Sequence, residues 1–428
     1  MKRIPEAFLH YLWKYKLFYT NDLSTCNEEP VEILIHGDHN QDAGPDFLNA
    51  KIKIGDTLWA GNVEIHINSS DWYKHGHHKD KAYDNVILQV VLNHDKEIFR
   101  TNGTQIATME LKFSKKLYEN YETLLLNESW IPCEDKIKET EEFIINFWLS
   151  KLTIERLEDK ANQIEQQLTK NKNDWENTFY QMLAKNFGFK TNGQPFEMLA
   201  KTLPLTLLAK HKNNLLQVEA LLFGQAGFLE QDQSDSYTFS LNKEYKHLKN
   251  KFRLKPIDKH MWKFSRLRPA NFPTIRIAQF AQLIHKSQSL FSKIMETSEI
   301  KSLQEYFEVT PSEYWHKHYR PGKLSAGKKK TLGVNAFHNI VINTIVPFLF
   351  VYGTYKENEI YRERALSYLQ KIPPEKNKII KQWKKIGITA ENAYYSQALL
   401  QLKNNYCRHK KCLSCEIGNK IIKQTNHA

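Results

Sequence analysis

Residues 44–68 read GPDFLNAKIKIGDTLWAGNVEIHIN, and their pattern predicts a β-hairpin in the N-terminal part of the chain. After the Gly44–Pro45 breaker, apolar and polar residues alternate, which is the period of a β-strand. Gly55–Asp56 then supplies a hairpin-type turn. The second alternating run predicts a strand on which Glu64 and His66 share one face, because side chains two residues apart point the same way.

The neighbouring segments extend this hairpin into a small α/β domain. A helix is predicted over Glu6–Tyr19 and a short strand over Glu32–His36. After the hairpin, a helix is predicted over Ser69–Tyr83. The nearly all-apolar run Val86–Leu92 then predicts a strand covered on both faces. This order of elements predicts a mixed sheet with helices packed against it.

From residue 114 onward almost every segment has helical periodicity. The sequence therefore predicts an α/β domain over residues 1–113, a helical and basic region over 114–400, and a cysteine-rich segment over 401–428. The expected helices cover Phe143–Leu168, Asn177–Phe187, Pro195–Leu208, Ile275–Phe291, Phe337–Phe350 and Ala390–Tyr406.

Composition indicates the class of protein and of partner. The 428 residues include 61 Lys and Arg against 48 Asp and Glu, a net charge of +13 that favours nucleic acid first and an anionic membrane surface second. The longest apolar run, Ile340–Tyr352, is too short to span a bilayer and contains Asn343 and Pro347, so no membrane insertion is predicted. Five cysteines make a disulfide framework unexpected and favour a reducing, cytoplasmic location.

The polar residues of the hairpin suggest a metal site. Asp46 begins the first strand, and the turn brings it alongside the strand that carries Glu64. Two carboxylates at one end of a sheet form a hard-oxygen site suited to Mg²⁺ or Mn²⁺, which can assist phosphodiester hydrolysis. The alternative is that Pro45–Asp46 is only a turn and Glu64 only a solvated strand residue. The sequence leaves both open.

These residues and the order of elements resemble the PD-(D/E)XK nuclease superfamily over roughly the first hundred residues. The resemblance implies a restriction-endonuclease-like sheet with Asp46, Glu64 and the backbone carbonyl of Ile65 as metal ligands. It also implies that Glu6, on the first helix, is an additional acidic residue. His66 stands where the superfamily has a lysine that orients the attacking water, and a neutral imidazole can position water near pH 7. The full-length pattern also resembles an uncharacterised bacterial protein family.

Other polar side chains surround this motif. Gln89 lies inside an apolar strand and would either reach the site or satisfy a neighbouring backbone group. Besides His66, five of the 17 histidines crowd into a stretch of about forty residues around the carboxylates: His36, His39, His75, His77 and His78. They could line a phosphate-binding groove, for which His75, His77 and His78 are the candidates, or bind a transition metal. Their spacing lacks the i, i+4 pair of a zinc helix, and a solvated helix face is the alternative.

The C-terminal segment carries a second candidate metal site. Cys407, Cys412 and Cys415 have C-x₄-C-x₂-C spacing, which favours a metal over a disulfide in a cytosolic protein. Zinc and an iron–sulfur cluster both agree with this spacing. Cys133 or His409 could complete the site. Some nucleases of the superfamily hold an iron–sulfur cluster with one distant and three C-terminal cysteines, which this set resembles. Free structural thiols are the alternative.

The helical region contains two basic segments. Lys243–Arg268 holds ten Lys and Arg with interleaved aromatic residues, and a second cluster follows at Lys323–Lys330. Such segments predict phosphate contacts and base stacking, whereas the alternative is solvated helix faces with aromatics in the core. The candidate phosphate contacts are Lys251, Arg253, Arg266, Arg268, Arg276, Lys328, Lys329 and Lys330.

Together these features predict a metal-dependent nuclease acting on DNA or RNA, with Asp46 and Glu64 holding Mg²⁺ or Mn²⁺ and with His66 and Gln89 beside them. One alternative is a non-catalytic nucleic-acid-binding protein with a degenerate nuclease fold. A second alternative is a protein-interaction scaffold.

Overall fold

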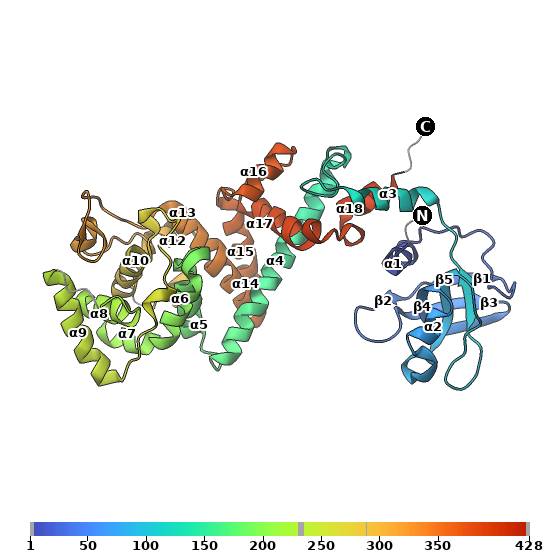
Figure 1. Cartoon of the computed structure of the whole chain (residues 1–428), viewed down its shortest axis with the longest axis horizontal. Helices are drawn as coiled ribbons and strands as arrows, with labels where there is room; N and C mark the ends of the chain where they lie inside the picture. Colours follow the sequence, from blue (N-terminus) through green and yellow to red (C-terminus); the bar gives the residue numbers. More distant parts are fainter. Residues whose placement is uncertain (1–3, 230–234, 288, 425–428) are drawn as a thin grey trace. The chain divides into compact units, whose positions relative to one another are not determined.

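The computed structural model describes residues 4–229, 235–287 and 289–424. The chain forms two compact units, one made of residues 1–148 with 402–428 and the other of residues 149–401 (Figure 1). This division differs from the three segments expected from composition. The cysteine-rich C-terminal segment belongs to the same unit as the α/β domain, and residue 113 lies inside that unit.

The first unit contains the expected mixed sheet. Its strand order is β1-β3-β4-β5-β6, with the short β2 paired to β3. β1 and β4 are antiparallel to β3, whereas β5 is parallel to both β4 and β6. The strands are β1 (Val31–Ile35), β2 (Asp38–His39), β3 (Phe47–Ile54), β4 (Thr57–Asn68), β5 (Val86–Asn93) and β6 (Ala107–Glu110).

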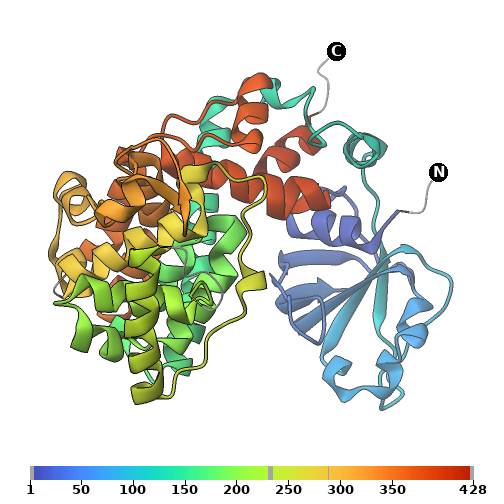
Figure 2. The same cartoon turned by 60° about the vertical axis from the view of Figure 1, so that its left-hand side comes forward.

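The hairpin and the buried strand have the structure that their sequences predict. Ile54 pairs with Thr57 around the turn. β5 is buried from Val86 to Val91, as an all-apolar central strand requires. α1 (Glu6–Lys14) lies over one end of the sheet and contacts β4, and its buried residues include Trp13 (Figures 1 and 2).

The helix predicted over Ser69–Tyr83 is the main local difference. It is broken into α2 (Asp71–Lys74) and two 3₁₀ turns, His77–Lys79 and Lys81–Tyr83. Gly76 causes the break: its φ of +80° is a left-handed conformation that ends a helix and that glycine adopts without steric penalty.

Two further helices complete the first unit. α18 (Glu416–Lys423) packs on α3 (Lys115–Leu126). Asn120 on α3 donates to the carbonyls of Ile422 (3.1 Å) and Gln424 (2.9 Å). A long-range contact therefore caps the C-terminal end of α18 and holds the chain terminus in this unit.

The second unit is a helical body with one large apolar core. α4 (Glu142–Lys170) runs into it from the first unit. Its other helices are α5 (Trp175–Phe187), α6 (Phe189–Thr202), α7 (Leu205–His211), α8 (Leu215–Gln225), α9 (Ser236–Phe252), α10 (Pro273–Lys286), α11 (Leu290–Glu296), α12 (Ile300–Tyr306), α13 (Val334–Ile340), α14 (Val346–Tyr355), α15 (Glu359–Lys371), α16 (Lys378–Lys385) and α17 (Ala393–Gln401). Two strands, β7 (His318–Arg320) and β8 (Lys323–Leu324), form a small hairpin.

Two of the predicted helices are interrupted. The segment Pro195–Leu208 breaks between α6 and α7 at Leu203 and Pro204, because proline excludes the α conformation of the residue before it. The segment Ile275–Phe291 is also divided between two helices: α10 ends at Lys286, and α11 begins at Leu290.

The most apolar helix is a core helix of the second unit. α13, a π-helical turn (Val341–Ile345) and α14 continue one another over Val334–Tyr355, which is long and apolar enough to cross a membrane by length and composition. However, 72% of its apolar window is buried inside the protein. Burial against the other helices accounts for its composition.

Candidate functional site

The carboxylates of Asp46 and Glu64 interlock where the β3–β4 pairing ends. The backbone N–H of Asp46 donates to Glu64 Oε2 (3.1 Å), and the backbone N–H of Ile65 donates to Asp46 Oδ2 (2.9 Å). The pairing ends with Phe47 opposite Val63, so the Asp46 side chain, rather than a β3 carbonyl, receives the Ile65 N–H. Because N–H and C=O of one residue point to the same side of an extended strand, the Ile65 carbonyl also faces Asp46.

A buried hydrogen-bond chain fixes His66 on the same face. Gln89 Nε2 lies 3.0 Å from His66 Nδ1 and 3.2 Å from the carbonyl of Ser69, and Thr108 Oγ1 donates to Gln89 Oε1. Since the Gln89 amide donates to Nδ1, the neutral His66 ring carries its proton on Nε2. That N–H faces His75 Nδ1 (3.1 Å) and lies 3.6 Å from Glu64 Oε1.

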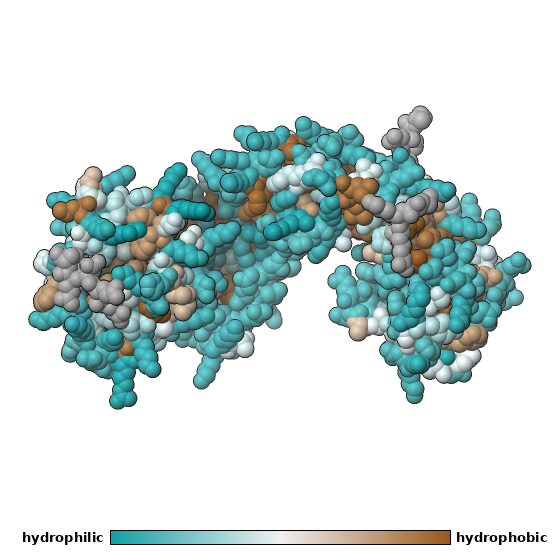
Figure 3. Space-filling view, viewed as in Figure 1, coloured by the Kyte–Doolittle hydropathy of each residue, from teal (hydrophilic) through white to brown (hydrophobic). Residues whose placement is uncertain are grey.

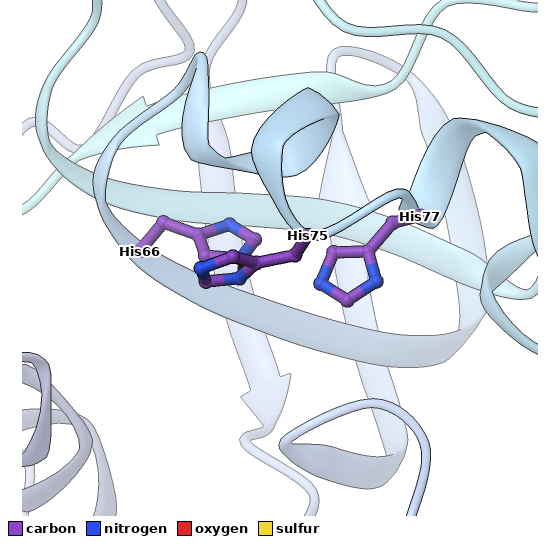
Figure 4. A group of neighbouring side chains, drawn as sticks. All are labelled: His66, His75 and His77. Carbon is purple, nitrogen blue, oxygen red and sulfur yellow. Dashed lines mark hydrogen bonds between the residues drawn. The ribbon is translucent and has the colours of Figure 1, made fainter.

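Two more histidines converge on His66 from the broken helix. His75 Nδ1 lies 3.1 Å from His66 Nε2, and His77 Nε2 lies 3.2 Å from Glu64 Oε1. One ring nitrogen from each of the three histidines lies within 4.8 Å of the others, from β4 and from the α2 region (Figure 4). Imidazole nitrogens at this spacing can bind a transition metal when the nitrogen facing the metal is unprotonated, which for His66 requires the other tautomer and a turned Gln89 amide. The sequence spacing disfavoured a histidine metal site, but the break at Gly76 makes one possible.

Helix α1 adds two residues to this face. His10 Nε2 lies 3.3 Å from Asp46 Oδ2. Burial raises the pKa of Glu6. The charges of Asp46 and Asp71 also raise this pKa, whereas His10 and His75 lower it. Glu6 is therefore close enough to these groups for their charges to act on it. His10 was not predicted, although it lies four residues after Glu6 and therefore on the same helix face.

The two carboxylates have opposite electrostatic environments. Burial and the charge of Asp46 hold the pKa of Glu64 above its usual value, against the effect of His77. Burial also raises the pKa of Asp46, but His10 and the Ile65 N–H lower it more, so the net shift is downward. Burial, with His75 and His77, lowers the pKa of His66 to about 3, so its ring is neutral at pH 7. The face therefore combines hard carboxylate oxygens with neutral imidazoles, a donor set that fits Mn²⁺ as well as Mg²⁺.

The other histidines expected near the site, His36, His39 and His78, lie outside this hydrogen-bonded group. The His36 carbonyl accepts from the Trp13 indole (3.1 Å). The ring of His39 packs on Phe47, and that of His78 packs on Tyr73. These three contacts are structural.

Most of the predicted phosphate contacts are exposed on the second unit, consistent with the hydrophilic surface in Figure 3. The exposed ones are Lys251, Arg253, Arg266, Arg268, Lys328 and Lys329.

Two of the predicted phosphate contacts are buried instead. Arg276, 6% exposed, donates to Gln279 (2.9 Å) and Asn271 (2.6 Å). Lys330, 5% exposed, donates to the carbonyls of Trp315 and His316. Both cations bind neighbouring backbone or amide groups, so neither is available to a nucleic acid. The prediction that Arg276 and Lys330 contact phosphate is therefore corrected.

The aromatic residues of the basic segment also belong to the core. Tyr245 is 3% and Trp262 5% exposed, and the Trp262 indole donates to the carbonyl of Ala226. Phe252 and Phe264 are half-buried against the same core. Tyr245 and Trp262 are therefore not free to stack on bases, because packing places them inside the core.

The four predicted cysteine ligands lie in the first unit and are all free thiols. Cys412 and Cys415 are buried, and Cys133 and Cys407 are half-buried.

Comparisons with known proteins identify a family but no activity. The chain has no match among curated proteins and none among solved structures. The family model described as "Protein of unknown function (DUF2851)" matches residues 6–378, which is most of the chain and includes the whole carboxylate and histidine site. The chain therefore belongs to the DUF2851 family.

Proposed function

We propose that the protein hydrolyses phosphodiester bonds of nucleic acid, using a divalent metal ion held by Asp46 and Glu64. The observation that carries this proposal is the interlock of the two carboxylates through the backbone N–H groups of Asp46 and Ile65. It fixes both side chains at the end of the β3–β4 pairing and turns the Ile65 carbonyl toward them. Two carboxylates and a carbonyl oxygen are ligands that Mg²⁺ and Mn²⁺ accept while keeping positions open for phosphate and water.

The connectivity supports the same proposal. The chain runs from α1 through three antiparallel strands, β1, β3 and β4, then through α2 to the parallel strand β5. This order agrees with the one that the resemblance to PD-(D/E)XK nucleases implies, and it supports the proposal. A bound metal ion supplies a Lewis acid and an activated water.

The role of His66 follows from its tautomer. Gln89 occupies Nδ1, so the ring presents its Nε2–H toward His75 and Glu64, and a substrate water or phosphate would take the place of His75. A neutral N–H donor can hold the attacking water or a phosphate oxygen in place, which is the positioning part of the task that a lysine performs in related motifs. It cannot supply the positive charge of lysine.

That missing charge supports a second candidate function, a protein that binds nucleic acid without cleaving it. The net charge of +13 and the exposed basic residues of the second unit support binding in both cases.

The test is cleavage of labelled single- and double-stranded DNA and RNA by the full chain in Mg²⁺, Mn²⁺ and Zn²⁺, with an EDTA control. Asp46→Asn and Glu64→Gln are the test variants. Asp56→Asn is the matched control, because Asp56 is an exposed residue in the turn of the same hairpin. We expect metal-dependent cleavage that both test variants abolish and the control retains.

Three outcomes would oppose this expectation in different ways. Binding without cleavage on any substrate would support the non-catalytic candidate, and His66→Lys would then test whether the missing cation is the cause. Cleavage that persists in Glu64→Gln would contradict the assigned site. Neither binding nor cleavage would favour the scaffold alternative.

A further inference from the structure

Four thiols from two distant parts of the chain converge in the first unit. Cys133 precedes the 3₁₀ turn Ile137–Glu139, whereas Cys407, Cys412 and Cys415 follow one another through two 3₁₀ turns before α18. All six pairs of these thiols are close enough for the charge on one sulfur to raise the pKa of the other. About 270 residues separate the two segments, so tertiary structure rather than local spacing brings them together.

Several contacts hold the two segments together around the thiols. Lys403 Nζ donates to the carbonyl of Trp130, and Lys410 Nζ donates to the carbonyl of Leu125. Gly418 packs directly on the backbone of Cys412, where a Cβ would approach the Cys412 carbonyl oxygen to 2.3 Å. The thiols therefore occupy a fixed frame rather than a loose terminus.

Backbone N–H groups face the sulfur of Cys415, although burial raises the pKa of this thiol to about 11. Cys415 is the N-cap residue of α18, and its sulfur accepts hydrogen bonds from the backbone N–H groups of Ile417 and Gly418. N–H donors at a helix N-terminus stabilise negative charge on sulfur. A neutral buried thiol would gain little from them.

The spacing of the sulfur atoms selects the kind of centre. Within the described residues, no three of the four sulfurs lie within 4.8 Å of one another. Four thiolates around a single Zn²⁺, at about 2.3 Å from the ion, would lie about 3.8 Å apart. An iron–sulfur cluster divides its four thiolates among two or four iron atoms, so no three of them gather around one ion.

We propose that Cys133, Cys407, Cys412 and Cys415 together ligate an iron–sulfur cluster that fastens the C-terminal segment to the first unit. The turn between Cys407 and Cys412 carries His409, Lys410 and Lys411, which line a cavity of about 290 Å³ against α1. The cluster therefore also holds basic side chains in place beside the helix that carries Glu6 and His10.

The test is the metal content of the full chain, purified without oxygen. Iron, acid-labile sulfide and zinc are measured per chain, together with the visible absorption that sulfur-to-iron charge transfer produces. We expect iron and sulfide in the wild-type protein, and loss of most of both in Cys133→Ser and in Cys407→Ser. Cys26→Ser is the matched control, since Cys26 is half-buried elsewhere in the unit, and it should keep the cluster.

Circular dichroism of each variant shows whether it has folded, and the wild-type iron and sulfide content tests the proposal even if a variant has not. Zinc without iron and sulfide would overturn the cluster assignment, and so would a wild-type protein without metal. Iron that is equally retained in Cys133→Ser and Cys26→Ser would overturn the ligand set. Because the readout is metal content, it does not depend on whether the protein cleaves nucleic acid.

Discussion

Several polar residues of this chain are buried, and each forms hydrogen bonds with specific partners. Gln89 is fully buried within β5, yet its amide bonds with His66, Ser69 and Thr108. The sequence showed that such a residue needs a partner. It did not show that the partner is the histidine of the candidate site, because that depends on the β4–β5 register, which pairs Glu64 with Gln89.

Glu219 gives a prediction for stability against pH. It is 1% exposed and accepts hydrogen bonds from Ser312 and Tyr237 (both 2.8 Å), and burial raises its pKa to about 7. The folded state therefore binds this proton more tightly than the unfolded state, so the stability contribution is present below about pH 4.5 and is lost as pH rises through about 7. The free energy of unfolding of the wild type should therefore fall by roughly 2–3 kcal/mol between about pH 4.5 and 8 because of Glu219. Glu219→Gln should abolish this fall.

Urea denaturation of the wild type and Glu219→Gln at several pH values measures this difference. Glu313→Gln, at an exposed glutamate next to Ser312, is the control and should follow the wild type. Parallel pH profiles for the wild type and Glu219→Gln would show that Glu219 is not the titrating group.

At the scale of elements, close backbone contact positions the strand that carries the site. A Cβ at Gly61 in β4 would lie 2.5 Å from the carbonyl oxygen of Asn85 and 2.4 Å from a methyl carbon of Ile87. Gly61→Ala must push β4 away from the start of β5, and we expect it to destabilise the protein by about 1–3 kcal/mol. Gly327→Ala is the control, because the nearest atom to its Cβ is 4.0 Å away.

Thermal unfolding of both variants measures this effect. Equal melting temperatures for Gly61→Ala and Gly327→Ala would contradict the close β4–β5 contact.

The sequence predicted these elements unequally well, for physical reasons. Alternation identified β3 and β4, and a continuous apolar run identified β5, because burial on one or both faces leaves a clear pattern. The break at Gly76 and the convergence of His75 and His77 on His66 were not predicted, because helical and irregular segments rich in polar residues have similar local sequences. Asp46 and Glu64 were identified because a hairpin alone brings them together.

At the scale of the whole molecule, a charged residue in a basic segment is not always a surface residue. Lys330 belongs to a run of three lysines but is buried, whereas Lys328 and Lys329 are exposed. Composition predicts the total charge and its attraction to a polyanion, but packing decides which cations are accessible. Local sequence patterns likewise could not predict that the C-terminal segment returns to the first unit. That return depends on long-range contacts such as the one between Asn120 and Ile422.

The exposure of Lys328 and Lys329 gives a prediction for nucleic-acid binding. The double variant Lys328→Ala, Lys329→Ala should weaken binding on all sequences and reduce the slope of log affinity against log salt by about 1.5–2. Fluorescence anisotropy at several salt concentrations measures the slope. Lys384→Ala, Lys385→Ala removes the same charge from exposed positions on α16. Equal slopes for the two double variants would mean that the loop at Lys328 has no special contact with nucleic acid.

The most direct test of the central claim, that Asp46 and Glu64 hold one divalent metal ion, is a Mn²⁺ titration of the full chain followed by electron paramagnetic resonance. It needs no knowledge of the substrate. We expect a tight Mn²⁺ site in the wild type and in Asp56→Asn, and loss of that site in Asp46→Asn and in Glu64→Gln. Equal Mn²⁺ binding in all four proteins would contradict it.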